Sequence, residues 1–316
     1  MFDLTTLGEG QIRLTVPHGE RLQSAGHLRV SAACAEANVA GLMAQLKRST
    51  SWGSILPEGD LAERCLAEFR AVGVDTSAIV RVPEGRTALY FMEPGEGPMP
   101  SYVTYDRLGT PFRDITADQL DWERLLNTRL VLLTGITAAL TSRTAAVVQE
   151  FAERAHSRGA GLVLDVNYRS LLWSPSRARE VLQPIAERAR ILFCSRRDAI
   201  TVFGVPREEP AANVPGMLRR RLGVESVVTT DRTSGVYVSG PEGDHALDVA
   251  VVPVIDRPGA GDALVAGALD GYLDGSLLDG VKTGMRLART ALTHYGDLTR
   301  IGLQDLRLPD SADIIR

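Results

Sequence analysis

The chain has 316 residues, of which 44% are hydrophobic and 23% are charged, and its formal net charge at pH 7 is -4. This composition is typical of a globular protein with a large core, and the negative charge argues against nucleic acid or an anionic membrane surface as a partner. No apolar run is long enough to span a bilayer, and the first ten residues lack the basic and apolar segments of a signal peptide. The three cysteines, Cys34, Cys65 and Cys194, lie far apart without the spacing of metal ligands. We therefore expect a cytoplasmic protein with reduced thiols.

The first 110 residues combine two predicted helices with short strand-like segments. Apolar spacing predicts helices over residues 35–46 and 60–72. Alternating apolar and polar residues between glycines and prolines predict four strands, over residues 11–16, 27–31, 88–93 and 102–106. We expect these strands to form a small β-lid that projects from the main domain, with bounds of about 11–31 and 88–107.

From about residue 115 to residue 300, short apolar runs alternate with amphipathic stretches. The runs predict buried strands, over residues 130–136, 162–166, 191–194, 226–230 and 249–255. The stretches between them predict helices, over residues 141–157, 184–189 and 214–222. Strand–helix alternation favours right-handed crossovers, so we expect an α/β fold with a doubly wound, mostly parallel sheet in one domain spanning residues 1–316.

The most informative segment is DRPGAGD at residues 256–262, between a predicted strand and an apolar helix. Gly259 and Gly261 allow a sharp turn and leave backbone N–H groups open to a ligand. The start of the following helix adds the positive end of its dipole, so the segment predicts a site for an anion such as a phosphoryl group in transfer. Asp262 lies in the first turn of that helix, where a carboxylate can take the proton from an attacking hydroxyl.

Other glycine-rich motifs do not fit the chain. The dinucleotide fingerprint G-x-G-x-x-G fails because Leu264 occupies a position where it needs a glycine and because the segment follows a late strand. The Walker loop fails at residues 275–283 (GSLLDGVKT), since a valine separates Gly280 from Lys282. The four residues GAGD alone are equally compatible with a structural turn. The upstream Asp256, the strand–helix context and the late position in the chain favour the catalytic interpretation.

A strand, D-x-x-GAGD and an Ala/Gly-rich helix together resemble the signature of the ribokinase-like (PfkB-type) sugar kinases, and the resemblance covers nearly the whole chain. Residues 35–40 (AEANVA) resemble the family segment in which Asn38 would face the sugar, and residues 70–76 (RAVGVDT) resemble another family element. The resemblance implies a lid over the sugar, ATP and Mg²⁺ as cofactors, a homodimer paired through the lid, and Asp262 as the general base. It also implies an anion hole, formed by Gly259, Ala260 and Gly261.

Three segments resemble the 2-keto-3-deoxygluconate kinases within this family. Residues 165–173 (DVNYRSLLW) resemble their D-x-N-x-R…LW segment, residues 105–107 (YDR) resemble their lid element, and Asp256-Arg257 opens the glycine motif in the same form. A planar guanidinium binds the carboxylate of a sugar acid bidentately, which agrees with this resemblance. The resemblance implies a set of substrate contacts: Asn38, Tyr90, Tyr105, Arg107, Asn167, Arg169 and Asp297. The alternative for each is a structural role, such as a surface arginine or a tyrosine packed within the lid.

The chain departs from the family at three places. Ala33 and Cys34 replace a Gly-Gly pair that lets the backbone approach the sugar, so we expect a narrowed or altered pocket. Ser195 replaces the asparagine of the N-x-x-E motif, which organises Mg²⁺ and phosphate contacts, and only one glycine remains of a K-x-G-x-x-G segment near the nucleotide. Nucleotide preference and the direct metal ligands therefore stay open. The resemblance implies nucleotide-side contacts at Ser195, Asp198, Thr230, Gly235 and Asp256.

Together these patterns favour an ATP-dependent kinase for a small sugar acid, with 2-keto-3-deoxygluconate as the expected substrate. A kinase for another sugar, such as fructose, ribose or a nucleoside, stays open. A sugar- or nucleotide-binding protein that has lost catalysis is a third hypothesis, motivated by the changes at Ala33, Cys34 and Ser195. The intact Asp262 and its glycines argue against that third hypothesis.

Overall fold

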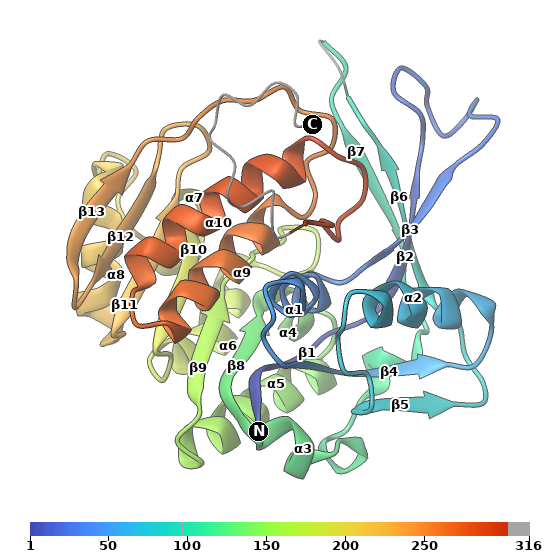
Figure 1. The fold of residues 1–316 in the computed structure, drawn as a ribbon, viewed down its shortest axis with the longest axis horizontal. Coiled ribbons are helices and arrows are strands. Elements are labelled where there is room, and N and C mark those ends of the chain that lie inside the picture. Colours follow the sequence, from blue (N-terminus) through green and yellow to red (C-terminus); the bar gives the residue numbers. More distant parts are fainter. Residues whose placement is uncertain (96–97, 303–316) are drawn as a thin grey trace.

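A nine-stranded sheet forms the centre of the molecule within residues 1–95 and 98–302, which this computed structural model describes. Its strands follow the order β13-β12-β11-β10-β9-β8-β1-β4-β5 (Figure 1). All neighbours from β11 to β5 pair in parallel, whereas β12 and β13 join one edge as antiparallel strands. The sheet confirms the predicted fold class. Its strands are β1 (Phe2–Leu7), β4 (Thr50–Pro57), β5 (Ile79–Val82), β8 (Thr128–Thr134), β9 (Gly161–Asp165), β10 (Ile191–Ser195), β11 (Ser226–Thr230), β12 (Val236–Gly240) and β13 (Gly243–Leu247).

Helices cover both faces of this sheet (Figure 1). In β8, Leu130 and Leu132 pack into the core with α1, α2, α9 and α10, while Val131 and Leu133 pack into the core with α5 to α8. Strands buried on both faces carry continuous apolar runs, which is why their sequences do not alternate. The helices are α1 (Ala35–Gln45), α2 (Asp60–Ala71), α3 (Trp122–Leu126), α4 (Gly135–Ala138), α5 (Ser142–Ser157), α6 (Pro175–Ala186), α7 (Arg196–Phe203), α8 (Val214–Leu222), α9 (Ala260–Leu273) and α10 (Leu277–Leu292).

Four further strands form a smaller sheet in the order β3-β2-β6-β7, which projects beyond the main sheet (Figure 1). Strands β6 and β7 have the bounds predicted from the sequence, and β2 and β3 differ from theirs by one or two residues. Strands β2 and β6 pair in parallel, with Arg13 opposite Tyr90. The four strands are β2 (Gln11–Thr15), β3 (Arg29–Ala33), β6 (Ala88–Glu93) and β7 (Tyr102–Asp106).

Close packing against α10 fixes the direction of α9, the helix that begins within the glycine motif. A Cβ atom added to Gly267 or Gly271 of α9 would lie 2.4 Å or less from backbone atoms of Gly284 or Gly280 in α10. The two backbones approach so closely that glycine alone fits at these positions. The N-terminus of α9 is thereby held beside the carboxyl ends of the parallel strands, where ligands bind in open α/β sheets.

The segment before the glycine motif differs from its prediction. Residues 249–255 form no strand, although their apolar run predicts one. Val251 is exposed, and Pro253 cannot donate a hydrogen bond to a neighbouring strand. The backbone N–H of Ile255 bonds to α10 instead, at the carbonyl oxygen of Leu292. The apolar run therefore lies along the edge of the fold rather than in the sheet.

Two other boundaries and five strands also differ from the prediction. The helix predicted over residues 184–189 is α6, which begins nine residues earlier, after Ser174 caps its first turn. The strand predicted over residues 130–136 ends at Thr134, whose side chain accepts a hydrogen bond from the backbone of Thr137 and starts α4. Strands β1, β4, β5, β12 and β13, which were not predicted from the sequence, complete the main sheet. Within the described ranges, no helix combines the length and the apolar character needed to cross a bilayer.

Candidate active site

Two cavities meet at the N-terminus of α9. The inner cavity, of about 470 Å³, lies between the small sheet and the carboxyl ends of β9, β10 and β11. The outer cavity, of about 740 Å³, lies between the region of β11 to β13 and helix α10. Both cavities are lined by Ser195, Arg197, Thr230, Gly261 and Leu264. Molecules bound in the two cavities would therefore approach each other at the start of α9.

Asp262 lines the inner cavity at this junction and is 9% exposed. Its Oδ2 accepts a hydrogen bond of 2.7 Å from Nδ2 of Asn38 in α1. Burial raises the pKa of Asp262 to about 8; the Asn38 hydrogen bond opposes the rise, and the charges of Asp297 and Asp165 add to it. A carboxyl group with a pKa near neutrality is suited to take up a proton during a reaction and to release it afterwards.

The glycine loop, residues 256–262, places its backbone between the two cavities. Gly259 precedes the first residue of α9 and has a φ of 89°, in the left-handed region that favours glycine. Gly261 lines both cavities, and a Cβ atom added there would meet no atom within 4 Å. This open space, together with the free N–H groups of a helix start at Ala260, provides a place for an anion.

Asp297 also lines the inner cavity, where strands of the small sheet hold it. The hydroxyl of Tyr90 donates to Asp297, at 2.8 Å from Oδ1 and 2.7 Å from Oδ2. Nη1 of Arg13 donates to Oδ1 of Asp297 at 2.6 Å. Tyr90 and Asp297 were predicted as site residues, but Arg13 was not, because an arginine in an alternating strand is typical of a solvent-facing position.

The two predicted arginines differ in their surroundings. Arg107 lines the inner cavity but is 4% exposed, and its Nε donates to Oε2 of Glu9 at 2.8 Å. Arg169 is exposed at the cavity, and its positive charge lowers the pKa of Asp262 against the larger effect of burial. The Tyr105 ring lies beside the guanidinium of Arg107, 5.5 Å from its carbon. Arg169 is therefore the arginine with the more accessible charge.

Asn167 has a left-handed backbone, with a φ of 37°, two residues after the end of β9. This conformation turns its Nδ2 back to Oδ2 of Asp165, at 3.0 Å. Burial raises the pKa of Asp165 to about 7. Asp165 lines the inner cavity with Asn167 and Asp198. Asp165 was not predicted as a site residue, although it opens the D-x-N-x-R segment, and its place at the end of β9 is the signal that points to it.

The predicted nucleotide-side residues separate into two groups. Ser195 and Thr230 lie where the cavities meet, and Asp198 lines the inner cavity. The Ser195 hydroxyl accepts a hydrogen bond from the backbone of Asp198 at 3.1 Å and so caps α7. Gly235 lies in the connection from β11 to β12 and lines neither of these cavities, and Asp256 lines neither because its carboxylate faces Arg13. The Asp256 carboxylate is thus held by Arg13 outside both cavities, and its nucleotide contact stays a prediction.

The departure at Ala33 and Cys34 falls on the wall of the inner cavity. The Cys34 thiol donates to Oε2 of Glu36 at 3.3 Å, and burial raises its pKa well above the ordinary value. The Oδ1 atom of Asn38, which is also buried in this wall, has no hydrogen-bond partner within the described residues. A buried carbonyl oxygen without a partner favours a ligand that brings a hydrogen-bond donor.

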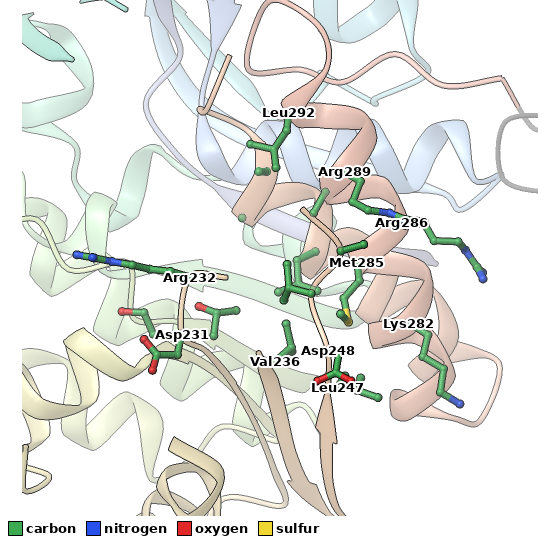
Figure 2. Close-up of a pocket in the computed structure, with 18 of the residues that line it drawn as sticks. Asp231, Arg232, Val236, Leu247, Asp248, Lys282, Met285, Arg286, Arg289 and Leu292 are labelled. Carbon is green, nitrogen blue, oxygen red and sulfur yellow. The ribbon is translucent and has the colours of Figure 1, made fainter. Parts of the chain in front are cut away.

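The outer cavity has mainly apolar walls. Leu247, Val249, Met285 and Leu292 line it together with the loop after β11. Figure 2 shows Met285 pointing towards the cavity from α10, whereas the side chains of Lys282 and Arg286 extend away from it. Asp231 lies on the opposite wall. An apolar slot that leads to a helix N-terminus can hold a flat base at one end and phosphates at the other.

Comparison with known proteins identifies the family. The model of the pfkB family of carbohydrate kinases matches residues 1–301. The chain belongs to this family. It is therefore a carbohydrate kinase, an enzyme that transfers a phosphoryl group to an alcohol group of a sugar.

Several relatives of this pfkB kinase carry more specific names. A 2-dehydro-3-deoxygalactonokinase of Haloferax volcanii is 30% identical over 298 residues, which cover 94% of this chain and 92% of the relative. A 2-dehydro-3-deoxygluconokinase of Thermoproteus tenax is 28% identical and covers 87% of this chain and 83% of its own. The crystal structure of a 2-dehydro-3-deoxygluconokinase of Thermotoga maritima has a TM-score of 0.92 at 26% identity, with 97% of both chains covered.

Proposed function

We propose that this pfkB kinase phosphorylates a 2-keto-3-deoxy sugar acid with ATP, the substrate being 2-keto-3-deoxygluconate or its galactonate epimer. The observation that carries the proposal is the place of Asp262. This buried carboxyl group lines the inner cavity where the outer cavity meets it, beside the N-terminus of α9. The names of the relatives add the class of acceptor.

The inner cavity would hold the sugar acid. Arg169 would bind its carboxylate, and Arg107 would contribute less because Glu9 already neutralises it. A carboxylate beside these guanidinium groups would gain charge-assisted hydrogen bonds that a neutral sugar lacks. The hydroxyl groups of the sugar would meet polar side chains of the same cavity, namely Asn38, Tyr90, Tyr105, Asn167 and Asp297.

Transfer would begin with Asp262 taking the proton of the attacking hydroxyl. The hydroxyl oxygen would then form a bond to the γ-phosphorus while the bond to the bridging oxygen of ADP breaks. The backbone N–H groups of Gly259, Ala260 and Gly261 would stabilise the negative charge on the transferred group. Asp262 would release its proton afterwards, which a pKa near 8 permits.

The outer cavity fits a nucleotide, since its apolar walls lead to the glycine loop. Ser195 and Thr230 would lie near the phosphates at the junction. The buried carboxylate of Asp198 and the neighbouring Asp165 suit Mg²⁺ through bound water, because this ion keeps much of its hydration shell. Mg²⁺ would offset the charge of the β and γ phosphate oxygens. We assign Gly235 to the turn that borders this region.

The test of the proposed function is an ADP-release assay with ATP and Mg²⁺. Both 2-keto-3-deoxy sugar acids, fructose, ribose and a nucleoside are offered as acceptors. We expect turnover of the sugar acids with kcat/KM at least about 10²-fold above that of each neutral acceptor, as expected for loss of a charged contact. Preferred turnover of a neutral sugar would overturn the sugar-acid proposal, and no turnover of any acceptor would favour a binding protein.

We also propose that the small sheet serves as a lid and pairs two chains. Strand β7 is an edge strand, and its Tyr102, Val103 and Tyr105 are exposed. Exposed apolar edges favour pairing with another chain, which a two-fold dimer satisfies. Light scattering at micromolar concentration should give a dimer, and V103K should shift it towards a monomer. A wild-type monomer would contradict this proposal.

A further inference from the structure

Arg13 is completely buried although it carries a charge, with an exposure of 0%. Arginine is rarely buried to this extent unless it is paired. Its Nη1 lies 2.6 Å from Asp297, and its Nη2 lies 2.7 Å from both carboxylate oxygens of Asp256. Asp256 precedes α9 and Asp297 follows α10. One side chain of the small sheet therefore joins the segments on both sides of this helix pair.

Both aspartates are in turn attached to the glycine loop. The carboxylate of Asp256 accepts hydrogen bonds from the backbone of Arg257 at 3.0 Å and of Gly296 at 3.1 Å. The carbonyl oxygen of Asp297 lies against Gly259, where an added Cβ would come within 2.2 Å of it. A shift of either aspartate would therefore displace Gly259, the residue from which α9 begins.

Tyr90 fixes the same group from the neighbouring strand. It lies opposite Arg13 in the pairing of β2 with β6, and its hydroxyl donates to both oxygens of Asp297. The guanidinium carbon of Arg13 lies 6.0 Å from the centre of the Tyr90 ring. Two side chains of the small sheet, Tyr90 and Arg13, thus donate hydrogen bonds to Asp297. Of these two, only Arg13 also contacts Asp256.

We propose that Arg13 is a positioning residue, which holds the glycine loop against the small sheet so that acceptor site and anion site form one rigid unit. The meaning of this unit for catalysis rests on the proposed function. Without the guanidinium, Asp256 and Asp297 would be left as buried charges without their partner, which is strongly unfavourable. The two segments would move apart, and the loop would leave its place between the cavities.

The test compares Arg13→Met with a matched control, Arg48→Met. Arg48 also bridges two aspartates, Asp270 at 2.6 Å and Asp274 at 2.7 Å, but it does so near the far end of α9. We expect Arg13→Met to lower kcat about 10²-fold, the cost of a small misplacement of reacting groups, with little change in the KM for ATP. Arg13→Lys should recover part of kcat, whereas Arg48→Met should keep kcat even if it loses thermal stability.

Hydrogen exchange of the proteins without substrate supplies a measurement that is independent of activity. Arg13→Met should speed the exchange of amides in residues 256–262, and Arg48→Met should not. If Arg13→Met does not fold, Asp256→Asn serves instead, because it keeps the pair of Arg13 with Asp297 and should speed the same amides. Equal kcat and equal exchange in both arginine variants would overturn the role of Arg13. Turnover of no acceptor by the wild type would overturn the proposed function, while the exchange result would still decide whether Arg13 holds the loop.

Discussion

The inner and outer cavities meet at Gly261 but are built from different interactions. Two charged residues of the inner wall, Asp297 and Arg107, are held by buried partners behind that wall, Arg13 and Glu9. The outer cavity has mainly apolar walls; Asp231, Arg232 and Asp248 border it, and the side chains of Lys282 and Arg286 extend away from it. Bonded polar groups have fixed positions and reject a ligand that leaves them unpaired, whereas an apolar slot tolerates differences between bases. We infer that the enzyme selects its acceptor more strictly than its nucleotide.

The largest expected effect comes from the base on the acceptor side. Asp262→Asn removes the group that takes the hydroxyl proton, so we expect kcat to fall by roughly 10²–10⁴-fold. The fold should be kept, since the amide has the same shape and Asn38 can still bond to its oxygen. The control is Asp274→Asn at the opposite end of α9, and steady-state kinetics with circular dichroism measure both variants.

The pH dependence of the wild type sharpens this prediction. Because burial raises the pKa of Asp262 to about 8, the carboxylate form becomes populated as the pH rises towards that value. The kcat/KM of the wild type should therefore increase with pH up to about 8. A flat profile from pH 5 upwards, or an Asp262→Asn variant with nearly full kcat, would contradict the role of this carboxylate as the base.

The second prediction concerns Gly261, which lines both cavities. Gly261→Val places a branched side chain in the open space at the start of α9, so transfer should fall at least about 10²-fold, as for lost positioning of reacting groups. The melting temperature and sugar binding by calorimetry should change little, because an added Cβ meets no neighbour within 4 Å. The contrary result is a variant that loses sugar binding while the sugar that still binds is phosphorylated at the normal rate. That result would mean that the phosphoryl group does not pass Gly261.

The third prediction concerns the charge on the acceptor side. Arg169→Ala should weaken a sugar acid by about 2 kcal/mol, the lower end for loss of a charged contact, because Arg169 is exposed. A neutral sugar should be affected much less, and the KM values of both acceptors measure the difference. Arg177→Ala, which removes an exposed arginine in α6, is the control. Equal weakening of acid and neutral sugar would contradict a carboxylate contact.

The smallest effect is expected on the nucleotide side. Ser195→Asn introduces the amide that the family resemblance implies at this position, and an asparagine side chain can cap α7 as serine does. The KM for ATP should stay unchanged or decrease. Any decrease should be a few-fold at most, because the mainly apolar outer cavity tolerates small changes around the nucleotide. The same assay in excess chelator should show no turnover, because the phosphate charges need a divalent ion. A sharp rise of the KM for ATP would refute this view of Ser195.

The main sheet could be predicted where local pattern decides the structure. Buried parallel strands carry continuous apolar runs, so residues 226–230 and most of 191–195 were predictable. The run at 249–255 is also apolar, but it contains Pro253 and its backbone bonds to α10 rather than to a strand, which is a property of the whole fold. The early strands β1 and β4 were not singled out: β1 takes its place in the main sheet by pairing with β8, far along the chain, and β4 pairs with β1.

In the site, too, only the features set by local sequence could be predicted. Asp262 and the glycine loop could be predicted because the motif is contiguous and each residue type has a direct chemical reason. Arg13 could not, because its partners Asp256 and Asp297 lie 243 and 284 residues away in the sequence. The sequence pattern of a strand is the same for a buried arginine and for an exposed one, so the two can be told apart only when the partners of the arginine are known. The pairing of Arg107 with Glu9 was hidden for the same reason.

The most direct test of the contrast between the cavities is a single matrix of kcat/KM values for the wild-type enzyme. It combines 2-keto-3-deoxygluconate and fructose as acceptors with ATP and GTP as donors. We expect the change of acceptor to alter kcat/KM by at least about 10²-fold and the change of donor by less than about tenfold, because the buried ion pairs lie on the acceptor side. A matrix in which the donor matters more than the acceptor would contradict the account.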